Sequence, residues 1–527
     1  MMISLMQWVY PTKTLESYSR SILSRKVSLV VFQLRYRSKK SEGKYLKLSD
    51  INQNTVAAKY AVRGSIPIRA DELDALLHSG KKHTLPFDKI VQANIGNPQQ
   101  LDQKPLTWYR QVLSIVQYPD ILNTPEANII YPSDVIERAK ILIEAIKSAG
   151  AYSNSQGVEY IRKSVADFIS KRDGYPSDPK DIFLTSGASS AVLYLLQILA
   201  SNKDSAFLIP IPQYPLYTAS IALNDSKPVG YYLNEENNWS TDPEQIRGLL
   251  EKSIADGTPH INSLVIINPG NPTGSILSKK EIVEVINIAA DYGIVLIADE
   301  VYQVNIFKGE FLSFKKVLCE LLENDHEKYK DVQLASLHSI SKGVSGECGQ
   351  RGGFMELFGF KHDIKNILFK LASINLCSVV SGQVLMELMV NPPKKGDPSY
   401  GTYHREVSHI QESLRTRADL LYNAFCKMTD VSCNKPMGAM YLFPRLHFTK
   451  DKYPEIFKLA EFTKTSVDEF YCLELLEKTG ICSVPGSGFG QVPGTLHVRT
   501  TFLPPGKEWI ERWVTFHEEF VQRFKTH

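Results

Sequence analysis

The sequence predicts an α/β protein with a mostly parallel sheet covered by helices on both faces, together with a smaller α+β domain. Between about residues 130 and 376, short apolar runs alternate with helical patterns, as in strands joined by crossover helices. Each apolar run is followed by a polar or Gly/Pro-rich turn. From Cys377 onward, long amphipathic helices alternate with short strand candidates, which indicates a second, smaller domain.

The composition is that of an ordinary globular chain. Its 527 residues are 43% apolar and 22% charged, and 60 basic residues nearly balance 57 acidic ones. We therefore expect small-molecule ligands, and neither nucleic acid nor a membrane as a partner. No stretch approaches the ~20 apolar residues that span a bilayer. The seven cysteines are scattered without a C-x-x-C pair, so we expect a reducing compartment, no disulfide framework and no metal site.

The first forty residues differ from the rest of the chain. They carry eight Lys or Arg and seven Ser against a single acid, Glu16, with apolar residues between them. This composition resembles a mitochondrial transit peptide and predicts a location in the mitochondrial matrix. The alternative is a disordered basic tail on a cytoplasmic protein. Residues 1–45 are therefore left out of the fold prediction.

The α/β region opens with a helix for which Ser133 is the candidate cap, and its apolar positions from Val135 to Ile146 share one stripe. Strand-like runs then recur at 181–185, 205–209, 263–267, 293–298 and 333–337. Open α/β sheets bind ligands at the carboxyl ends of their strands. The motifs that follow these runs are therefore expected to converge on one crevice.

The two ends of the chain are expected to pack together. Beyond residue 377, helices are expected at 405–425 and 509–524, with a strand candidate at 440–443. The stretch from about 46 to 120 is rich in turns and has no sheet of its own. It is therefore expected to pack with the carboxyl-terminal part.

Two of the turns that follow strands have the features of a ligand site. Ser186-Gly-Ala-Ser-Ser190 opens a helix whose free N–H groups and positive dipole end suit a phosphate. The alternative is that its Gly and Ser only cap the helix. Asn268-Pro-Gly-Asn-Pro-Thr-Gly274 is a tight Pro/Gly turn, and it aims the amide of Asn271 into the crevice.

Two further turns supply charged groups. Asp299 ends a buried run and needs a cationic partner, which a protonated pyridine nitrogen provides, although acids also end strands at the surface. Lys342, in Ser339-Ile-Ser-Lys-Gly343, follows another buried run and is a candidate nucleophile, the alternative being a solvated lysine. Ser339 and Arg351 complete a phosphate clamp. Together the four turns meet the needs of a pyridoxal 5′-phosphate site, in which Asn271 and Tyr302 reach the ring 3′-oxygen.

From about Asn54 onward, the chain resembles fold type I pyridoxal phosphate aminotransferases and, among them, alanine aminotransferases. The resemblance rests on the run after Asn54 and on Asn94-Ile-Gly-Asn-Pro-Gln-Gln, Ala151-Tyr-Ser-Asn-Ser-Gln-Gly, Pro210-Ile-Pro-Gln-Tyr-Pro-Leu-Tyr, Asn268-Pro-Gly-Asn-Pro-Thr-Gly, the stretch from His338 to Gly353, and Val498-Arg-Thr-Thr-Phe. It covers nearly the whole chain, and no expected cofactor position is missing.

The resemblance implies a role for each site residue. Lys342 would form the internal aldimine, Asp299 would pair with the ring nitrogen, and Tyr214 would stack on the ring. Arg499 would bind the substrate α-carboxylate beside Gly96; the alternative is a surface arginine, but its strand-like run favours an inward position. The phosphate would be held by Gly187, Ala188, Ser189, Ser339 and Arg351, with Tyr152 reaching it from the neighbouring subunit of a homodimer.

After the amino-terminal segment (1–45) that the composition sets apart, the family pattern implies an arm with part of the small domain (46–120), a large cofactor-binding domain (121–376) and the rest of the small domain (377–527). It implies reversible conversion of L-alanine and 2-oxoglutarate to pyruvate and L-glutamate by a ping-pong mechanism. Alternatives are another aminotransferase, lyase or decarboxylase of this fold, and a catalytically silent paralogue with a regulatory role. Loss of Lys342, Asp299 or Arg499 would indicate the silent paralogue, and all three are present.

One further motif concerns substrate choice. An enzyme that pairs alanine with 2-oxoglutarate must accept a methyl group and a distal carboxylate at the same position. A permanently buried second arginine would penalise alanine, so the distal contact is expected from a segment that can adjust. The motif Tyr60-Ala-Val-Arg63-Gly64 resembles the family's substrate-covering segment. Arg63, with Tyr60 beside it, is expected to make this contact; the alternative is a surface arginine beside a core tyrosine.

Overall fold

The computed structural model describes residues 46–58, 64–80 and 83–526. They fall into two compact units, one ending at Val56 and the other beginning at Ala57. The first unit holds the short 3-10 helix η1 (Leu48–Asp50) and most of helix α2 (Gln53–Ala57). All other elements below belong to the second unit. The segment 1–45, expected to be a transit peptide, lies outside the described residues.

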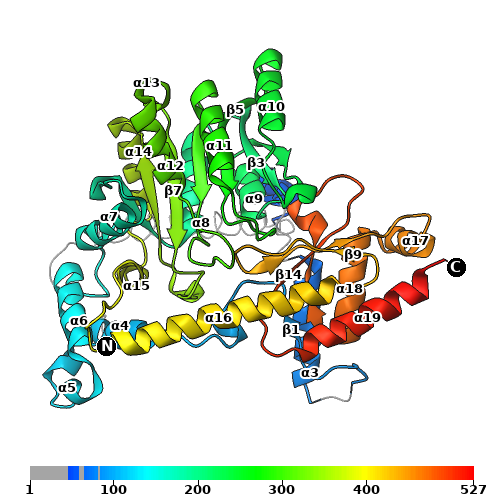
Figure 1. Ribbon diagram of the computed structural model, residues 1–527, viewed down its shortest axis with the longest axis horizontal. Helices are drawn as coiled ribbons and strands as arrows, with labels where there is room; N and C mark the ends of the chain where they lie inside the picture. Colours follow the sequence, from blue (N-terminus) through cyan, green and yellow to red (C-terminus); the bar gives the residue numbers. More distant parts are fainter. Residues whose placement is uncertain (1–45, 59–63, 81–82, 527) are drawn as a thin grey trace, which may run out of the picture. The chain divides into compact units, whose positions relative to one another are not determined.

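A mostly parallel sheet forms the centre of the second unit (Figure 1). Among the described residues it has seven strands, in the order β2-β8-β7-β6-β5-β3-β4. They are β2 (Ile182–Thr185), β3 (Ser205–Ile211), β4 (Lys227–Tyr232), β5 (His260–Ile267), β6 (Val295–Asp299), β7 (Leu334–Ser339) and β8 (Gly353–Phe358). The strands from β7 to β4 run parallel, and β8 is antiparallel to both its neighbours. The predicted fold class is therefore confirmed.

Strands β4 and β8 are not predicted from the sequence. In β4, the exposed Lys227 and Pro228 begin the strand, so its apolar signal is weak. In β8, Glu356 interrupts the apolar run and Gly353 starts it, and both residues are depleted in strands. Each strand forms because it pairs with neighbouring strands and is covered by the rest of the fold. These interactions cannot be recognised from the strand's own residues.

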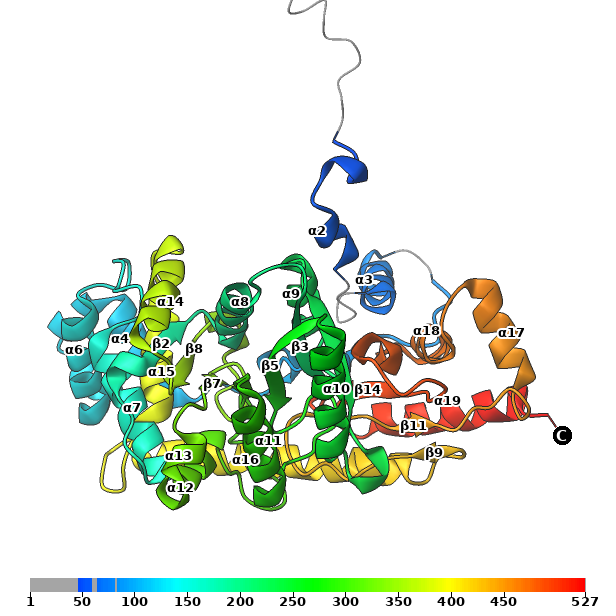
Figure 2. The same cartoon turned by 90° about the horizontal axis from the view of Figure 1, so that it is seen from above.

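The helices that follow these strands are α8 (Ala188–Leu199), α9 (Leu216–Leu223), α10 (Pro243–Asp256), α11 (Lys279–Tyr292), α12 (Phe314–Asn324), α13 (His326–Tyr329) and α14 (His362–Ile374). They cover both faces of the sheet, because successive side chains of a strand point to opposite faces. In β3, Phe207 and Ile209 pack in the core with α8 and α9, whereas Ala206 and Leu208 pack in the core with α10 and α11. Figure 2 shows α8, α9 and α14 on one side of the strands and α10 to α13 on the other.

The point at which a helix ends determines where the next strand begins, and so where a candidate site residue on that strand lies. Ser278 and Glu281 form a capping box at the start of α11, and Gly293 ends the helix with a φ of 66°. Glycine adopts this left-handed conformation without steric cost. Strand β6 starts two residues later and brings Asp299 to its carboxyl end.

The expected cap at Ser133 is wrong. Ser133 is the first residue of α6 (Ser133–Ile146), and Pro132 occupies the capping position without a side-chain capping bond. Proline fixes φ and lacks an N–H, so the chain enters the helix directly after it. The predicted apolar stripe is nevertheless present, since Val135 and Ile146 are buried.

The remaining helices are α3 (Ser65–His78), α4 (Thr107–Gln117), α5 (Ala127–Ile130), α7 (Glu159–Asp173), α15 (Val380–Val390), α16 (Tyr400–Phe425), α17 (Pro454–Thr463), α18 (Val467–Thr479) and α19 (Glu508–Phe524). The short strands are β1 (Val91–Gln92), β9 (Val431–Ser432), β10 (Tyr441–Leu442), β11 (Arg445–Leu446), β12 (Ile481–Cys482), β13 (Val484–Pro485) and β14 (Val498–Thr501). Strand β1 pairs with β12, which brings a segment before residue 121 against one after residue 377. The predicted domain boundaries themselves stay a prediction.

All seven cysteines lie within the described part of the chain and are free. Among the residues that the structure describes, no helix is both long and apolar enough to cross a membrane.

Candidate active site

A cavity of about 260 Å³ lies at the carboxyl ends of the central strands. The turns after β5, β6 and β7 and the start of α8 contribute to its walls, as the strand-end rule predicts. Residues from the two ends of the chain complete it. The predicted site residues that line it are Gly96, Ala188, Ser189, Tyr214, Asn271, Asp299, Tyr302, Ser339, Lys342, Arg351 and Arg499.

Lys342 presents its amine to this cavity. The side chain follows the end of β7, and Nζ donates a hydrogen bond of 2.7 Å to the carbonyl oxygen of Gly96. The described residues place no carboxylate within ion-pair distance of Nζ. Cys348, which the sequence analysis did not single out, lies beside the lysine and donates from Sγ to the Ser341 carbonyl at 2.9 Å. The amine is therefore held by a backbone carbonyl and is available to react.

The start of α8 and Arg351 form an anion-binding end. Gly187 caps α8 with a φ of 80°, and a side chain there would collide with the Arg351 guanidinium. Arg351 Nη2 donates to Ser189 Oγ at 3.1 Å and to the Ser186 carbonyl at 3.0 Å. Ser339 Oγ lies at the same end, donating 2.9 Å to Ser341 Oγ. A helix amino terminus together with a guanidinium suits a phosphate dianion.

Asp299 is a buried carboxylate on the cavity wall. Burial raises the pKa of Asp299 to about 6, although the Tyr217 hydroxyl, the Val301 N–H and the charge of Lys342 oppose that shift. Tyr217 donates to Asp299 Oδ2 at 2.9 Å. A cation placed against this carboxylate would remove the cost of its burial. Tyr217 lies three residues after Tyr214, in the Pro210 to Tyr217 run, and only the fold shows that it reaches Asp299.

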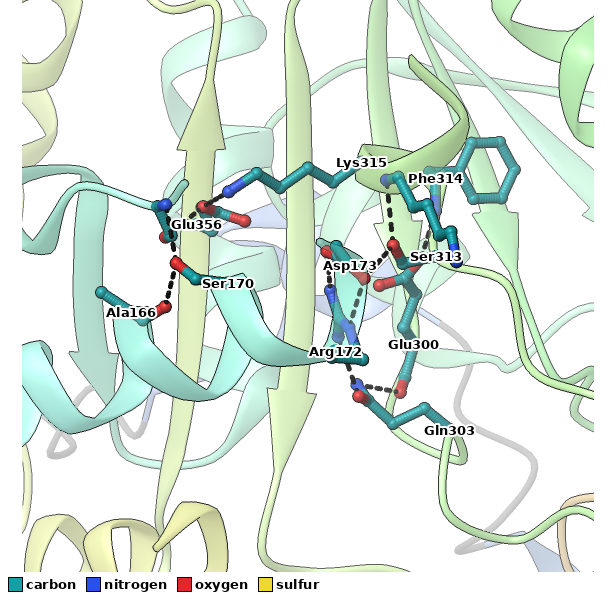
Figure 3. Close-up of polar contacts among 12 residues, drawn as sticks. Ala166, Ser170, Arg172, Asp173, Glu300, Gln303, Ser313, Phe314, Lys315 and Glu356 are labelled. Atoms are coloured by element: carbon teal, nitrogen blue, oxygen red, sulfur yellow. Dashed lines mark hydrogen bonds and ion pairs between the residues drawn. The ribbon is translucent and has the colours of Figure 1, made fainter. Parts of the chain in front are cut away.

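Glu300 does not line the cavity, and its side chain lies in a largely buried cluster with Arg172, Asp173 and Ser313 (Figure 3). The Phe314 N–H donates to Glu300 Oε1 at 2.9 Å. In the same cluster, Arg172 pairs with Asp173 through two bonds of 2.7 Å. Burial raises the pKa of Glu300 to about 8, and the charge of Arg172 only partly opposes this. Of the two adjacent carboxyl groups, only Asp299 faces the cavity, because neighbouring side chains at a strand end point to opposite faces.

Arg499 is a buried cation that lines the same cavity and is only 1% exposed. It lies on β14, and Nη1 approaches Asn271 Oδ1 at 3.5 Å while Nη2 donates to the Asn94 carbonyl. Within the described residues it forms no ion pair, and Nε has no hydrogen-bond partner. An unpaired buried guanidinium suits a carboxylate ligand.

Tyr441 also lines the cavity and was not predicted. Its ring lies 4.4 Å from the Arg499 guanidinium carbon and 6.2 Å from the Tyr302 ring, edge on. Burial opposes ionisation of Tyr441, but Lys342, Arg499 and a hydrogen bond with Tyr302 outweigh it and lower the pKa of Tyr441. Its aromatic character in the run 440–443 was the available signal, but that run was identified only as a strand candidate.

Two predicted residues that the structure describes, Tyr152 and Gly187, do not line this cavity. Tyr152 is 78% exposed and does not line it. Tyr60 and Arg63 lie outside the described residues. Gly187 stands just behind the wall, where it caps α8.

Solved structures share this fold. An alanine aminotransferase from Pyrococcus furiosus aligns with a TM-score of 0.69 and 24% identity, covering 90% of this chain and all of the other. An aspartate aminotransferase from Rhizobium meliloti aligns with a TM-score of 0.66 and 16% identity, covering 90% and 99%. These likenesses establish the fold type I architecture.

Relatives of known sequence are much more similar. A mitochondrial alanine aminotransferase of Saccharomyces cerevisiae is 55% identical over 488 residues, covering 91% of this chain and 81% of that protein. A protein of the same yeast named as an inactive alanine aminotransferase is 52% identical over 494 residues, covering 92% and 96%. A probable mitochondrial alanine aminotransferase of Dictyostelium discoideum is 46% identical over 501 residues, covering 92% and 91%. The mitochondrial names of two of these relatives support the predicted mitochondrial localisation.

Residues 122–508 match the family model for class I and II aminotransferases, and the chain belongs to this family of enzymes.

Proposed function

We propose that the chain is a pyridoxal 5′-phosphate-dependent alanine:2-oxoglutarate aminotransferase of the mitochondrial matrix that works by a ping-pong mechanism. One observation carries the proposal: an amine, a buried carboxylate, an anion-binding helix end and an unpaired buried guanidinium all open onto one cavity. The choice of alanine as amino donor is supported by the names of the relatives from yeast and Dictyostelium.

The cavity residues fit the proposed cofactor. Its phosphate would lie at the start of α8 against Arg351 and Ser339, where N–H and guanidinium donors converge. Asp299 would hold a proton on the ring nitrogen, because the cation offsets the burial of the carboxylate. Tyr302 and Asn271 would donate to the 3′-oxygen, and Tyr214 would cover the ring face. When bound, the cofactor supplies an electron-withdrawing ring that stabilises negative charge on the substrate Cα.

The chain's own residues would perform the remaining tasks. Arg499 would bind the substrate α-carboxylate, and the surrounding burial makes that ion pair strong by excluding water. Lys342 would take the proton from the substrate Cα in the first half-reaction. It would return a proton to Cα in the reverse half-reaction. Gly96 keeps the amine in place, since its carbonyl accepts a hydrogen bond from Nζ. The second oxo acid would follow the same steps in reverse.

The substrate range and the quaternary structure are parts of the same proposal. Arg63, beside Tyr60, would bind the distal carboxylate of glutamate and 2-oxoglutarate. Tyr152 would reach the phosphate of a partner subunit in a homodimer, and its high exposure leaves the side chain available for that contact. The Leu376 carbonyl accepts a hydrogen bond from Ser155 Oγ, three residues after Tyr152. Leu376 and Val379 are 52% and 43% exposed, as interface side chains are before assembly.

A coupled assay with L-alanine and 2-oxoglutarate tests the proposal, together with a visible spectrum of the purified protein. We expect a yellow protein that forms pyruvate and glutamate in equal amounts. Release of ammonia or carbon dioxide from alanine instead would identify a lyase or a decarboxylase. The inactive yeast relative shows that family membership does not guarantee turnover. A yellow protein without pyruvate formation would therefore indicate a silent paralogue.

A further inference from the structure

Arg499 is held in place by aromatic rings rather than by an acid. Its guanidinium carbon lies 4.4 Å from the ring centre of Tyr441 and 4.5 Å from that of Phe489. Both rings are buried, Tyr441 at 3% exposure and Phe489 at 0%. An aromatic face attracts a cation, and the attraction grows when water is excluded.

The two rings come from either side of the arginine's own strand. Strand β14 lies between β10 and β13. Tyr441 of β10 pairs with Thr501, two residues from Arg499, so both side chains project from the same face as diagonal neighbours. On the other side, Val484 of β13 pairs with Arg499, and the turn that follows β13 carries Phe489. The local strand register therefore brings both rings to the guanidinium.

The turn that carries Phe489 is itself tied down. The Phe489 carbonyl accepts from the Gln213 N–H at 2.8 Å, directly beside Tyr214. Asp468 is fully buried and accepts from the Ser487 N–H at 2.7 Å and from Gln491 Nε2 at 3.2 Å. These bonds fix the backbone at Ser487 and at Phe489, and they hold the Gln491 side chain two residues after the ring. The ring is thus a fixed wall for the arginine.

A carboxylate in place of the rings would serve the site poorly. An acid paired with Arg499 would compete with an incoming carboxylate for the same N–H donors, and exchange would require breaking a buried ion pair. Ring faces stabilise the cation while they leave its N–H edge open. They also fix the plane of the guanidinium, so that less ordering is required when a carboxylate binds.

We propose that Tyr441 and Phe489 form an aromatic clamp that positions Arg499 and sets the affinity of the site for a carboxylate. The inference rests on the proposed function in that the carboxylate is the α-carboxylate of the amino and oxo acid substrates. Tyr441 and Phe489 are positioning residues, since they act through Arg499. The hydroxyl of Tyr441 has a separate task, because it hydrogen bonds with Tyr302 at the cofactor end of the cavity.

Phe489→Met tests the clamp, and Phe443→Met is the matched control. Methionine nearly preserves buried volume but has no ring. Phe443 is also buried, at 3% exposure, and packs 6.0 Å from Phe489, but its ring stacks on His497 at 4.7 Å. Propionate, a carboxylate without an amino group, is titrated into the cofactor-loaded proteins by calorimetry. We expect Phe489→Met to weaken propionate binding about tenfold, equivalent to ~1.4 kcal/mol, and Phe443→Met to change it less than about twofold.

Kinetics separate positioning from general damage. Phe489→Met should raise the KM for alanine and for 2-oxoglutarate by similar factors, because both substrates share the α-carboxylate contact, and kcat should fall less than KM rises. Equal propionate affinities in Phe489→Met and Phe443→Met would overturn the clamp. If the proposed function failed instead, the unaltered protein would form no pyruvate from alanine. The propionate affinities of the unaltered protein and the two variants could still be compared.

Tyr441 provides an independent variant. Tyr441→Phe keeps the ring and should leave propionate affinity within about twofold, while it shifts the pH titration of the bound cofactor's visible absorbance through the lost contact with Tyr302. Tyr441→Met removes the ring and should weaken propionate about tenfold. If Tyr441→Phe weakened propionate as much as Tyr441→Met, the hydroxyl and not the ring would hold the carboxylate site, and the clamp would be wrong.

Discussion

Tyr217 donates a 2.9 Å hydrogen bond to Asp299, joining the first turn of α9 to the end of β6. Both side chains are buried. The bond orients the carboxylate along the cavity wall and favours its ionised form, against the burial that raises the pKa of Asp299 to about 6. Two predictions follow from this pair and its neighbour Glu300.

The first concerns stability without cofactor. The folded pKa of Asp299, about 6, lies above the ordinary value of 3.8, so the folded chain holds a proton that the unfolded chain releases between these values. The contribution of Asp299 to stability is therefore fully present below about pH 4 and is lost as the pH rises through 6. Relative to Asp299→Asn, the free energy of unfolding of the cofactor-free protein should fall by about 1 kcal/mol from pH 5 to pH 7. Urea denaturation measures this, and parallel pH profiles would contradict it.

The second compares the adjacent carboxyl groups. Asp299→Ala should lower kcat/KM by more than about a hundredfold, because the ring nitrogen loses the group that stabilises its charge. Glu300→Gln should lower it less than about threefold, since the raised pKa of Glu300 keeps it neutral at pH 7 and an amide still accepts from the Phe314 N–H. Steady-state kinetics of both variants decide the matter. A larger loss in Glu300→Gln would reverse the assignment.

The third concerns Lys342. Lys342→Ala should reduce turnover by at least about 10³-fold, in the range expected for removal of an acid–base group. The cofactor should still bind, because Arg351 and the start of α8 are unchanged. Equilibrium dialysis of the cofactor and a pyruvate assay measure the two effects separately. Normal transamination by this variant would remove Lys342 from the reaction.

Residues that follow strands of the main sheet could be found from the sequence. Lys342 and Asp299 each follow an apolar run, and the strand-end rule places such residues together in one crevice. The structure brings both to the cavity, with Arg351 and Ser189 at the same site. Their chemistry could be inferred because a charged group at the end of a buried run is partly desolvated and needs a partner.

Tyr217, Tyr441 and Phe489 could not be found in this way. Strands β10 and β13 have only two residues each, too short for an apolar period to be recognised. The position of Phe489 depends on a turn that Asp468 and Gln213 hold through backbone N–H groups, and no side-chain pattern encodes such bonds. Tyr217 lies in the first turn of a helix, where a buried tyrosine looks like ordinary core.

The fourth prediction concerns Arg63, which lies outside the described residues. Arg63→Ala should weaken the use of glutamate and 2-oxoglutarate by ~2–5 kcal/mol, the cost of breaking a desolvated charge pair, or roughly thirtyfold to several thousandfold in kcat/KM. Alanine and pyruvate lack the distal carboxylate and should be affected much less. Separate measurement of the two half-reactions tests this, and equal losses in both would show that Arg63 supports the fold or the cofactor instead.

A single half-reaction tests the central claim most directly. Cofactor-loaded protein is mixed with excess L-alanine in the absence of any oxo acid, and pyruvate is counted per subunit. We predict one pyruvate per subunit with loss of the yellow colour, which returns with one glutamate when 2-oxoglutarate alone is then added to the alanine-free protein. No pyruvate in the first step, or pyruvate only when both substrates are present together, would contradict an alanine aminotransferase that works through Lys342 by a ping-pong mechanism.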